Sequence, residues 1–562
     1  MPRNLIHKVL FLGIRIQARL LVTQFERSTK QPLAVQERTL LKKIRRNEDS
    51  AFGRDHGFAR IRSIADFRKA FPVHDYAYFE PYVERVKRGE LSAMFGPGER
   101  LVMFSLTSGT TGKPKYIPIT TSFVKSYQRT ALLWGAWAFY CHPMLIENKI
   151  LPIVSSIREE ATELGVPCGA ASGLHAQSQR YLGRALYAVP GIVSEIHNSE
   201  AKYYTVMRLS AAQSVSIVSS PNPSTMIAVA RTGDAHKESI IRDICDGTLS
   251  GEFDVPPEVR DALKRRLRRN PRRAKELEEV VRRTGHLLPK DIWPDLVLIA
   301  SWKGGPLRSY LPMYPEYYGD VPLRDLGLIA SEGRMSIPIS DEGSSGILDI
   351  ESNFFEFIPE DQEGSANPQT LLCTEVEVGK RYFIVLTTAS GLYRYNIYDL
   401  VEVTGFHNGT PLIAFLNKGR HMSSLTGEKI HEVQVVDAVR HASAAIGQTI
   451  ETFTLCPCWD GTPHYLLLVE ESRLGNGGAE DRFLQAADAS LCRLNIEYEK
   501  KRESKRLGPM RLMLVANGSF ERLRRETIEH QRGRAEQYKH PYLVSEQEFL
   551  KRFTVVRSVP SK

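Results

Sequence analysis

A nine-residue segment rich in glycine, hydroxyl and lysine side chains, Thr107–Lys115, constrains the fold of this chain more than any other feature. It follows an apolar segment, 101–104, that is typical of a buried strand, and it precedes a long apolar segment, 122–140, that is typical of a helix. Gly109 and Gly112 relieve the steric cost of a tight turn and allow backbone N–H groups to approach an anion. The segment therefore predicts a phosphate-binding loop, with a polar hairpin turn as the plainer interpretation.

The loop departs from two familiar phosphate-binding motifs. Only two residues separate Gly109 from Gly112, and Lys113 is followed by Pro114 instead of Ser or Thr. This spacing excludes a Walker loop, and the segment is not a Rossmann fingerprint either.

The rest of the chain alternates between strand-like and helix-like segments. Apolar runs at 150–154, 214–218 and 296–300 are typical of buried strands. Because helix-like segments separate them, we expect an α/β architecture. The segment 381–417 is strand-like, and beyond Gly419 the two patterns alternate again. We therefore expect a large domain over residues 1–417 and a smaller α+β domain over residues 418–562.

The composition is that of an ordinary globular protein, with one unusual feature, its charge. Of 562 residues, 42% are hydrophobic and 25% are charged, but the net charge is +10, which suggests an anionic partner. Residues 264–283 contain ten Lys or Arg against three Glu. Their apolar positions and the Asn270-Pro271 break predict two surface helices, and no nucleic-acid motif accompanies them. We expect no nucleic-acid partner, although a basic binding or scaffold protein is the alternative.

The start of the chain and the cysteines bear on its location. The segment Leu5–Val22 is apolar but contains Lys8, Arg15 and Arg19, so it does not predict a membrane-spanning helix. It predicts an amphipathic helix packed on the body, with a membrane-surface helix as the alternative and no stable membrane insertion. Seven scattered cysteines do not form a disulfide framework. These features predict a cytoplasmic protein. We expect it to be a monomer or weak homodimer.

Five further segments accompany the loop and carry a family resemblance. The loop resembles the signature of adenylate-forming enzymes, and with the other segments the chain resembles the auxin-responsive Gretchen Hagen three (GH3) family of acyl-acid amido synthetases over essentially its whole length. These segments are Ala51–Asp55, Ile292–Pro294, the acidic motif Leu328–Gly333, Gly391–Val403, which is similar to a "YRxGD" motif, and Glu536–Pro541, which is similar to "QYKxP".

This resemblance implies a fold and a reaction. The large domain would contain stacked αβαβα sheets and a β-barrel-like part, and the smaller domain would be mobile. The enzyme would join a small carboxylic acid to the α-phosphate of ATP, release pyrophosphate, and pass the acyl group to an amine, expected to be an amino acid. Transfer to coenzyme A is the nearest alternative. ATP and Mg²⁺ are the implied cofactors.

The resemblance also assigns roles to residues. Lys539 and Glu332 would be catalytic, Glu332 would also be a ligand for Mg²⁺, which prefers oxygen ligands, and Asp399 would bind the ribose hydroxyls. Lys539 would bring a point charge to the reacting phosphate and carboxylate. The implied nucleotide-binding residues are Thr107, Ser108, Gly109, Thr110, Thr111, Gly112, Lys115, Ala330, Ser331, Glu332, Asp399 and Arg420.

Each of the three central residues also has a simpler interpretation. Glu332 could cap a turn, Asp399 could pair with Arg394, and Lys539 could be a surface lysine. The chain departs from the family pattern at Tyr398, where the motif has glycine, and at Leu328, near which plant members carry an aromatic residue. The phosphate loop has the shorter superfamily form. These departures indicate a divergent member of the family.

Overall fold

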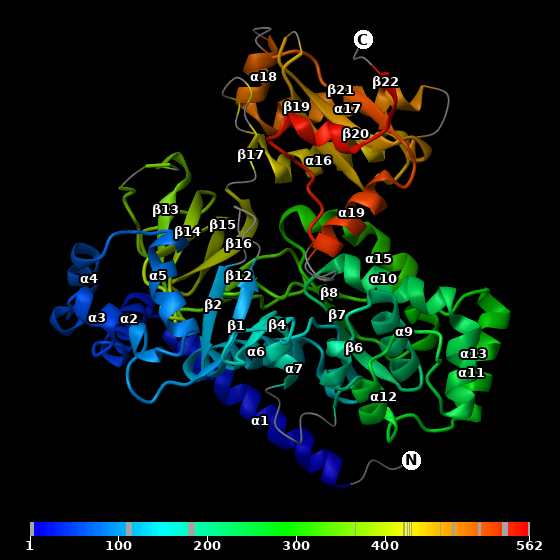
Figure 1. Ribbon diagram of the computed structural model, residues 1–562, viewed down its shortest axis with the longest axis horizontal. Coiled ribbons are helices and arrows are strands. Elements are labelled where there is room, and N and C mark those ends of the chain that lie inside the picture. Colours follow the sequence, from blue (N-terminus) through cyan, green and yellow to red (C-terminus); the bar gives the residue numbers. More distant parts are fainter. Residues whose placement is uncertain are drawn as a thin grey trace. The chain divides into compact units, whose positions relative to one another are not determined.

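The computed structural model describes residues 5–107, 115–177, 186–362, 364–365, 367–419, 422–423, 425, 428, 430–460, 462–474, 478–503, 507–530 and 538–559. The chain divides into two compact units. Unit 1 comprises Met1–Gly304 and Met313–Phe415, and unit 2 comprises Gly305–Pro312 and Leu416–Lys562 (Figure 1).

The first sheet of unit 1 carries the predicted phosphate loop. Its strands are β1 (Leu101–Thr107), β2 (Lys115–Thr120), β4 (Glu160–Ala161) and β5 (Pro167–Gly169), in the order β2-β1-β5-β4. Strands β1 and β2 are antiparallel, so the loop joins two strands before helix α6 (Thr121–Cys141) begins. The Thr120 hydroxyl caps this helix by accepting a hydrogen bond from the Phe123 N–H.

The second sheet is entirely parallel, as buried apolar strands predict. Its strands are β3 (Lys149–Pro152), β6 (Val215–Ser219), β7 (Leu298–Ala300) and β8 (Leu323–Arg324), in that order. Between these strands lie α7 (Ser172–Gln177), α9 (Ser199–Ser210), α10 (Pro223–Ala235), α11 (Lys237–Asp246), α12 (Pro257–Leu263), α13 (Pro271–Thr284), α14 (Pro289–Ile292) and α15 (Tyr314–Tyr318). The alternation confirms the expected α/β architecture.

The third sheet includes the segment 381–417, which was expected to be strand-like. It has six strands, β11 (Ser336–Ile337), β12 (Gly346–Leu348), β13 (Phe354–Pro359), β14 (Arg381–Thr387), β15 (Tyr395–His407) and β16 (Thr410–Lys418). Their order is β11-β12-β16-β15-β14-β13, and the pairs described are antiparallel. A short hairpin, β9 (Ile329–Ala330) and β10 (Gly333–Arg334), precedes this sheet.

The N-terminal helices pack against the first and third sheets. They are α1 (Leu5–Ser28), α2 (Pro32–Arg46), α3 (Ala51–Asp55), α4 (Ile64–Ala70) and α5 (Tyr76–Lys87). One apolar core unites side chains such as Phe52, Phe67 and Phe79 of these helices with Phe104 of β1 and Phe355 of β13. Helix α1 packs on α6 in a smaller apolar cluster. No helix of the described residues is long and apolar enough to cross a membrane.

The basic segment 264–283 differs from its prediction. Residues 271–284 form α13, but 264–270 form a turn and a stretch without regular secondary structure instead of a helix. Like charges four residues apart, as at Arg265 and Arg269, destabilise a helix, which explains why α12 ends at Leu263.

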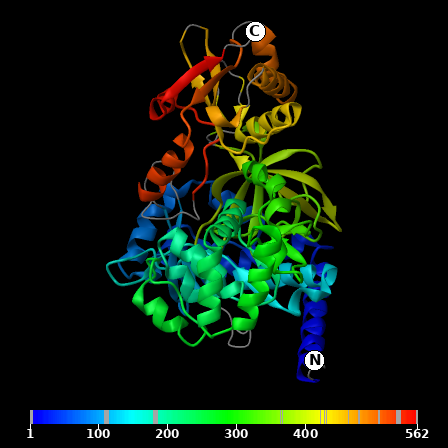
Figure 2. The same cartoon turned by 90° about the vertical axis from the view of Figure 1, so that its right-hand side faces the viewer.

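Unit 2 is a four-stranded mixed sheet with helices on it (Figure 2). Its strands are β19 (Phe453–Cys458), β20 (His464–Glu470), β21 (Arg511–Val515) and β22 (Val555–Val559), in that order. Its helices are α16 (Glu432–Ile446), α17 (Ala479–Leu494), α18 (Ile496–Glu503) and α19 (Ser519–His530), and a short hairpin of β17 (Met422–Ser423) and β18 (Ile430–His431) precedes them. Leu455 and Leu467 face the core under α16 and α17, whereas Cys456 and Leu466 face a second apolar cluster. All seven cysteines are free.

Candidate functional site

The predicted phosphate loop connects two paired residues. Thr107 at the end of β1 pairs with Lys115 at the start of β2. Ser108, Gly109, Thr110, Thr111 and Gly112, which belong to the predicted site, lie outside the described residues. Of the loop, the structure therefore describes the side chain of Lys115 and the backbone of Thr107.

Lys115 lies between two buried tyrosines. Its Nζ donates a hydrogen bond of 3.4 Å to the Oη of Tyr395, and it lies 5.5 Å and 5.9 Å from the ring centroids of Tyr76 and Tyr395. The Tyr76 hydroxyl donates to the carbonyl of Tyr116 and accepts from its N–H, at 3.0 Å and 2.9 Å. Since ring faces attract a cation, the two tyrosines fix the direction of the Lys115 side chain.

The two predicted carboxylates, Glu332 and Asp399, both raise the pKa of Tyr395. Glu332 lies in the turn between β9 and β10, Asp399 lies on β15, and both side chains are buried. Burial raises the pKa of Tyr395, and the charges of Glu332 and Asp399, with those of Tyr76 and Asp75, raise it further. Three predicted residues therefore interact with Tyr395, Lys115 through a hydrogen bond and Glu332 and Asp399 through their charges.

A bulge in β15 positions Asp399. Phe383 of β14 pairs with Leu400, but Val385 pairs with Asn396, so extra residues of β15 protrude from the ladder. Within this bulge Tyr398 has a φ of 59°, and its N–H donates a 2.8 Å hydrogen bond to Oδ1 of Asn396. The left-handed conformation is one that glycine adopts freely and other residues rarely do. The departure at Tyr398 therefore does not prevent the backbone from adopting a conformation that is typical of glycine.

Arg394 does not pair with Asp399, because it binds a buried glutamate on another strand. Its Nε donates to Oε2 of Glu356 at 2.8 Å and one terminal nitrogen donates to Oε1 at 3.0 Å. Arg68 donates to the same Oε1 at 2.8 Å, and Arg394 also donates to the carbonyl of Phe71 at 2.6 Å. Arg394 therefore fixes the backbone where β15 begins.

The remaining predicted residues of unit 1 lie near this cluster in the chain. Ala330 ends β9, Ser331 follows it in the turn, and both are half-buried. Leu328 is buried in the main core. Lys303, which follows β7, is not part of this cluster, because its Nζ donates to the carbonyls of Leu323, at 2.9 Å, and Asp341.

Lys539 belongs to unit 2, where an anchored segment carries it. His540 Nε2 lies 2.8 Å from the carbonyl of Phe453, and the Leu455 N–H donates to the carbonyl of Tyr542 at 2.9 Å. The segment thus runs alongside β19, and Lys539 itself is exposed. Burial lowers the pKa of His540 to about 4, so the imidazole is neutral near pH 7. Arg420, the other predicted residue of this part, lies outside the described residues.

Glu432 at the start of α16 fastens the same segment. Its Oε1 accepts a 3.0 Å hydrogen bond from the Tyr542 N–H. Burial raises the pKa of Glu432 to about 7, against the opposing effects of the backbone donors and the charge of Lys539. The Lys539 side chain and the buried carboxylate of Glu432 therefore influence each other electrostatically. Sequence reasoning missed Tyr76 and Tyr395 beside Lys115 and Glu432 beside Lys539, although Tyr395 lies inside a recognised motif.

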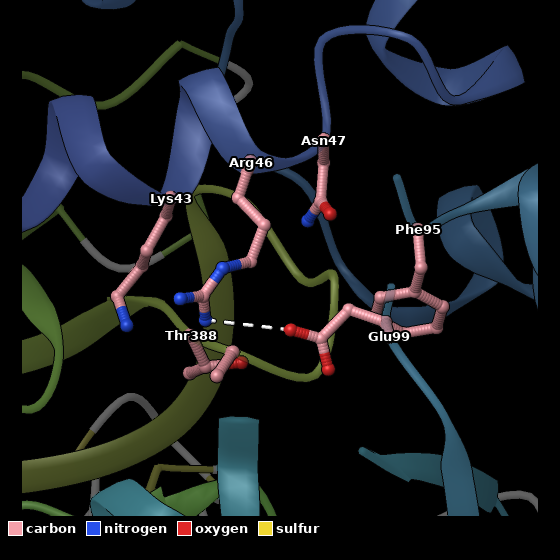
Figure 3. A pocket seen from close by; sticks show the side chains of 7 residues that line it. Lys43, Arg46, Asn47, Phe95, Glu99 and Thr388 are labelled. Atoms are coloured by element: carbon pink, nitrogen blue, oxygen red, sulfur yellow. Dashed lines mark ion pairs between the residues drawn. The ribbon is translucent and has the colours of Figure 1, made fainter. Parts of the chain in front are cut away.

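A separate pocket lies between α2 and the segments that flank β1 and β14 (Figure 3). Arg46 lies 3.4 Å from Glu99, and Lys43 donates a 2.7 Å hydrogen bond to the carbonyl of Ser352. Burial, together with the charge of Arg46, lowers the pKa of Lys43 to about 7. The pocket encloses about 230 Å³ including space open to solvent, less than ligand sites usually occupy, and no predicted site residue lines it.

The described residues contain no group of three His, Cys, Asp or Glu side chains arranged to hold a metal ion. The buried Glu332 carboxylate is a hard oxygen donor of the kind that binds Mg²⁺ through one carboxylate together with water and phosphate oxygens. Such a site needs only one protein ligand. The residues present therefore fit a metal ion that arrives with the nucleotide.

Comparison with known families matches three consecutive regions of the chain. The GH3 family N-terminal domain matches residues 21–323, the central domain matches 346–418 and the C-terminal domain matches 433–548.

Individual relatives match over most of their length. A jasmonoyl–L-amino acid synthetase, JAR6 of Nicotiana attenuata, is 27% identical over 529 residues, which cover 89% of each chain. An indole-3-acetic acid-amido synthetase, GH3.10 of Arabidopsis thaliana, is 24% identical over 540 residues, which cover 88% of this chain and 90% of the relative. The solved structure of the GH3.15 acyl acid amido synthetase is 22% identical, covers 96% of this chain and 97% of its own, and superposes with a TM-score of 0.83. The fold is therefore that of GH3 structures.

Proposed function

Because the chain belongs to the GH3 family, over three consecutive domains, we propose that it adenylates a small acyl acid with ATP and conjugates it to an amino acid. It is an acyl acid amido synthetase, and the expectation drawn from the sequence is confirmed in this respect. This membership favours amide formation over both transfer to coenzyme A and a scaffold role for the basic segment.

One observation carries the assignment of the site. Lys115, Glu332 and Asp399 come from three segments of unit 1, and each interacts with Tyr395: Lys115 through a hydrogen bond, and the two carboxylates through their charges. A nucleoside triphosphate has anionic phosphates, which bind a cation, and ribose hydroxyls, which donate to a carboxylate. We therefore assign phosphate binding to Lys115 and the loop before it, and ribose binding to Asp399.

The first half-reaction builds negative charge on the phosphoryl oxygens. The carboxylate oxygen of the acid attacks the α-phosphorus, and the bond to pyrophosphate breaks, which leaves an acyl adenylate. Fixed N–H, hydroxyl and ammonium groups aimed at these oxygens lower the barrier. Mg²⁺, when it is bound through Glu332, would neutralise part of this charge. Lys115 is oriented for this task before the nucleotide binds, because Tyr76 and Tyr395 hold it.

The second half-reaction transfers the acyl group to the amine. The amine nitrogen attacks the acyl carbon, AMP leaves with the bonding electron pair, and the nitrogen loses a proton. We propose that residues 418–562 form a mobile domain that brings Lys539 to the reacting groups during adenylation. The attachment of its segment to β19 and Glu432, at a residue that is itself exposed, supports this role.

The substrates follow from the relatives by class only. The relatives named above act on jasmonic acid and indole-3-acetic acid, and a GH3.15 structure holds 2,4-DB. We propose a small carboxylic acid with an apolar body as the acyl substrate and an amino acid as the acceptor. The enzyme would work in the cytoplasm as a monomer or weak homodimer and bind no nucleic acid.

A library of carboxylic acids tests this function by acid-dependent release of pyrophosphate, with mass spectrometry of the product when amino acids and coenzyme A are offered together. We expect an amide and AMP. A thioester without any amide would refute the proposed second step.

The Lys539→Ala variant tests the role of the exposed lysine. We expect pyrophosphate release to fall at least about a hundredfold, since one electrostatic group at a charged transition state has this effect, while ATP still binds. The matched control is Lys551→Ala, which removes an exposed lysine of unit 2 that pairs with Glu548 at 2.6 Å. Equal rates in the two variants would remove Lys539 from the mechanism.

A further inference from the structure

Helix α1 has apolar side chains on two opposite faces. One face packs on the body, where Ala18 and Val22 contact the cluster that contains Phe139 of α6. On the other side, Leu12, Ile16 and Leu20 are 56%, 52% and 67% exposed. At 3.6 residues per turn these three side chains fall within an arc of about 80° and point roughly away from the packed face. Figure 2 shows the N-terminal part of α1 extending beyond the other elements of unit 1.

Single exposed leucines are ordinary, but a continuous stripe is not. Leu12, Ile16 and Leu20 are spaced by four residues, so they form one row along the helix. Arg15 and Arg19 are exposed beside this row. The first acidic residue of α1 is Glu26, near its C-terminal end, where it accepts a hydrogen bond from His407 at 2.8 Å. The exposed face is therefore apolar and cationic.

This combination selects among partners. Two copies meeting through the stripe would bring their arginine rows close together, and like charges oppose such pairing. A nucleic acid would neutralise the arginines but leave the row of aliphatic side chains in water. A surface of anionic lipids can bind the aliphatic row and the arginines together. The acyl region accepts the aliphatic side chains, while the guanidinium groups reach the phosphates. The helix would lie along the surface, since it is not apolar enough to cross it.

We propose that the face of α1 formed by Leu12, Arg15, Ile16, Arg19 and Leu20 binds an anionic membrane surface. The enzyme would then associate reversibly and peripherally with such a membrane. The inference is independent of the proposed reaction, because it rests on residues outside the candidate site.

Vesicle binding by the full-length protein tests the proposal. Vesicles of phosphatidylcholine alone and vesicles with 30% phosphatidylglycerol would be sedimented with the protein at low and high salt. We expect binding only with phosphatidylglycerol. Each arginine near such a surface contributes about 1 kcal/mol, which is about fivefold in the partition coefficient, so Arg15→Ala with Arg19→Ala should weaken binding about 25-fold.

A matched pair of substitutions separates the stripe from general surface charge. Leu20→Glu should weaken binding at least about tenfold, whereas Leu164→Glu, at a leucine 60% exposed in the turn before β5, should leave it within twofold. Both variants should keep the melting temperature and the amide-forming rate in solution. The proposal is overturned if the wild type does not bind the anionic vesicles, if both variants bind equally, or if Leu20→Glu instead dissociates a dimer in light scattering.

Discussion

The buried carboxylate of Glu356 offers a sharp test of how the site is supported. Glu356 is 1% exposed and accepts hydrogen bonds from Arg68 and Arg394 at 2.8 Å and from the Thr370 hydroxyl at 2.7 Å. It is the counter-charge of both arginines. The substitution Glu356→Gln keeps the shape and one acceptor oxygen but leaves two guanidinium groups without their negative partner.

The expected loss of stability follows from this burial. Removing one partner of a buried ion pair costs about 3–5 kcal/mol, because the remaining charge is left uncompensated. Unit 1 contains roughly 400 residues, and an unfolding entropy of about 2.1 cal/mol/K per residue gives about 0.85 kcal/mol/K. The melting temperature of unit 1 should therefore fall by about 4–6 °C.

Tryptophan fluorescence is a suitable assay, because four of the five tryptophans lie in unit 1. The matched control is Glu360→Gln, which neutralises a glutamate 3.8 Å from Arg381 in a pair that is 33% and 45% exposed. An exposed pair contributes less than about 1 kcal/mol, so the control should shift the melting temperature by about 1 °C or less. Equal shifts in the two variants would refute the claim that the Glu356 network supports the strand carrying Asp399.

Two further variants test single contacts in the site. Glu432→Gln removes the carboxyl group whose pKa is raised. Between pH 4.5 and 7 the folded wild type binds more protons than the unfolded chain, so its free energy of unfolding should fall by at most about 3 kcal/mol as pH rises through this window. Urea unfolding at pH 5 and pH 8 should show this fall in the wild type and not in the variant. Tyr395→Phe removes the acceptor for Lys115, so the KM for ATP should rise about fivefold, whereas Tyr140→Phe, at an exposed tyrosine of α6, should leave it unchanged.

Local pattern predicted the main elements, and it failed where pairing or charge decided the structure. The apolar runs that became β3, β6 and β7 and the helix α6 were predictable, because burial imposes their composition. Strand β2 was not, because Lys115–Thr120 contains a charge and Pro118 and becomes a strand only through its pairing with β1. The stretch 264–270 has helix-forming residues but repeats like charges too closely.

The residues of the candidate site also fall into those that local sequence predicted and those that only the packing of the chain revealed. Motif resemblance pointed to Lys115, Glu332 and Asp399, because each of them lies in a short contiguous motif that the sequence alone shows. It did not reveal that Tyr395 joins them, since that contact depends on the packing of segments more than 200 residues apart. Tyr398 shows a second limit: its left-handed backbone is unusual for tyrosine, and its residue type therefore gave no sign of that conformation.

The proposed catalytic and binding groups of unit 1 are held in place differently from Lys539 of unit 2, and this difference has a physical rationale. Tyrosine rings hold Lys115, and a bulge and the Glu356 network hold Asp399. These groups therefore need no rearrangement when negative charge develops on the phosphoryl oxygens. Fixed dipoles and charges lower a reaction barrier most under this condition. Lys539, by contrast, is an exposed residue on an anchored segment. A cation bound permanently beside the acyl adenylate would hinder the approach of an ammonium-bearing amino acid. Under the proposed role of Lys539, its place on a separate unit would allow this charge to assist adenylation and then to leave before the amine attacks.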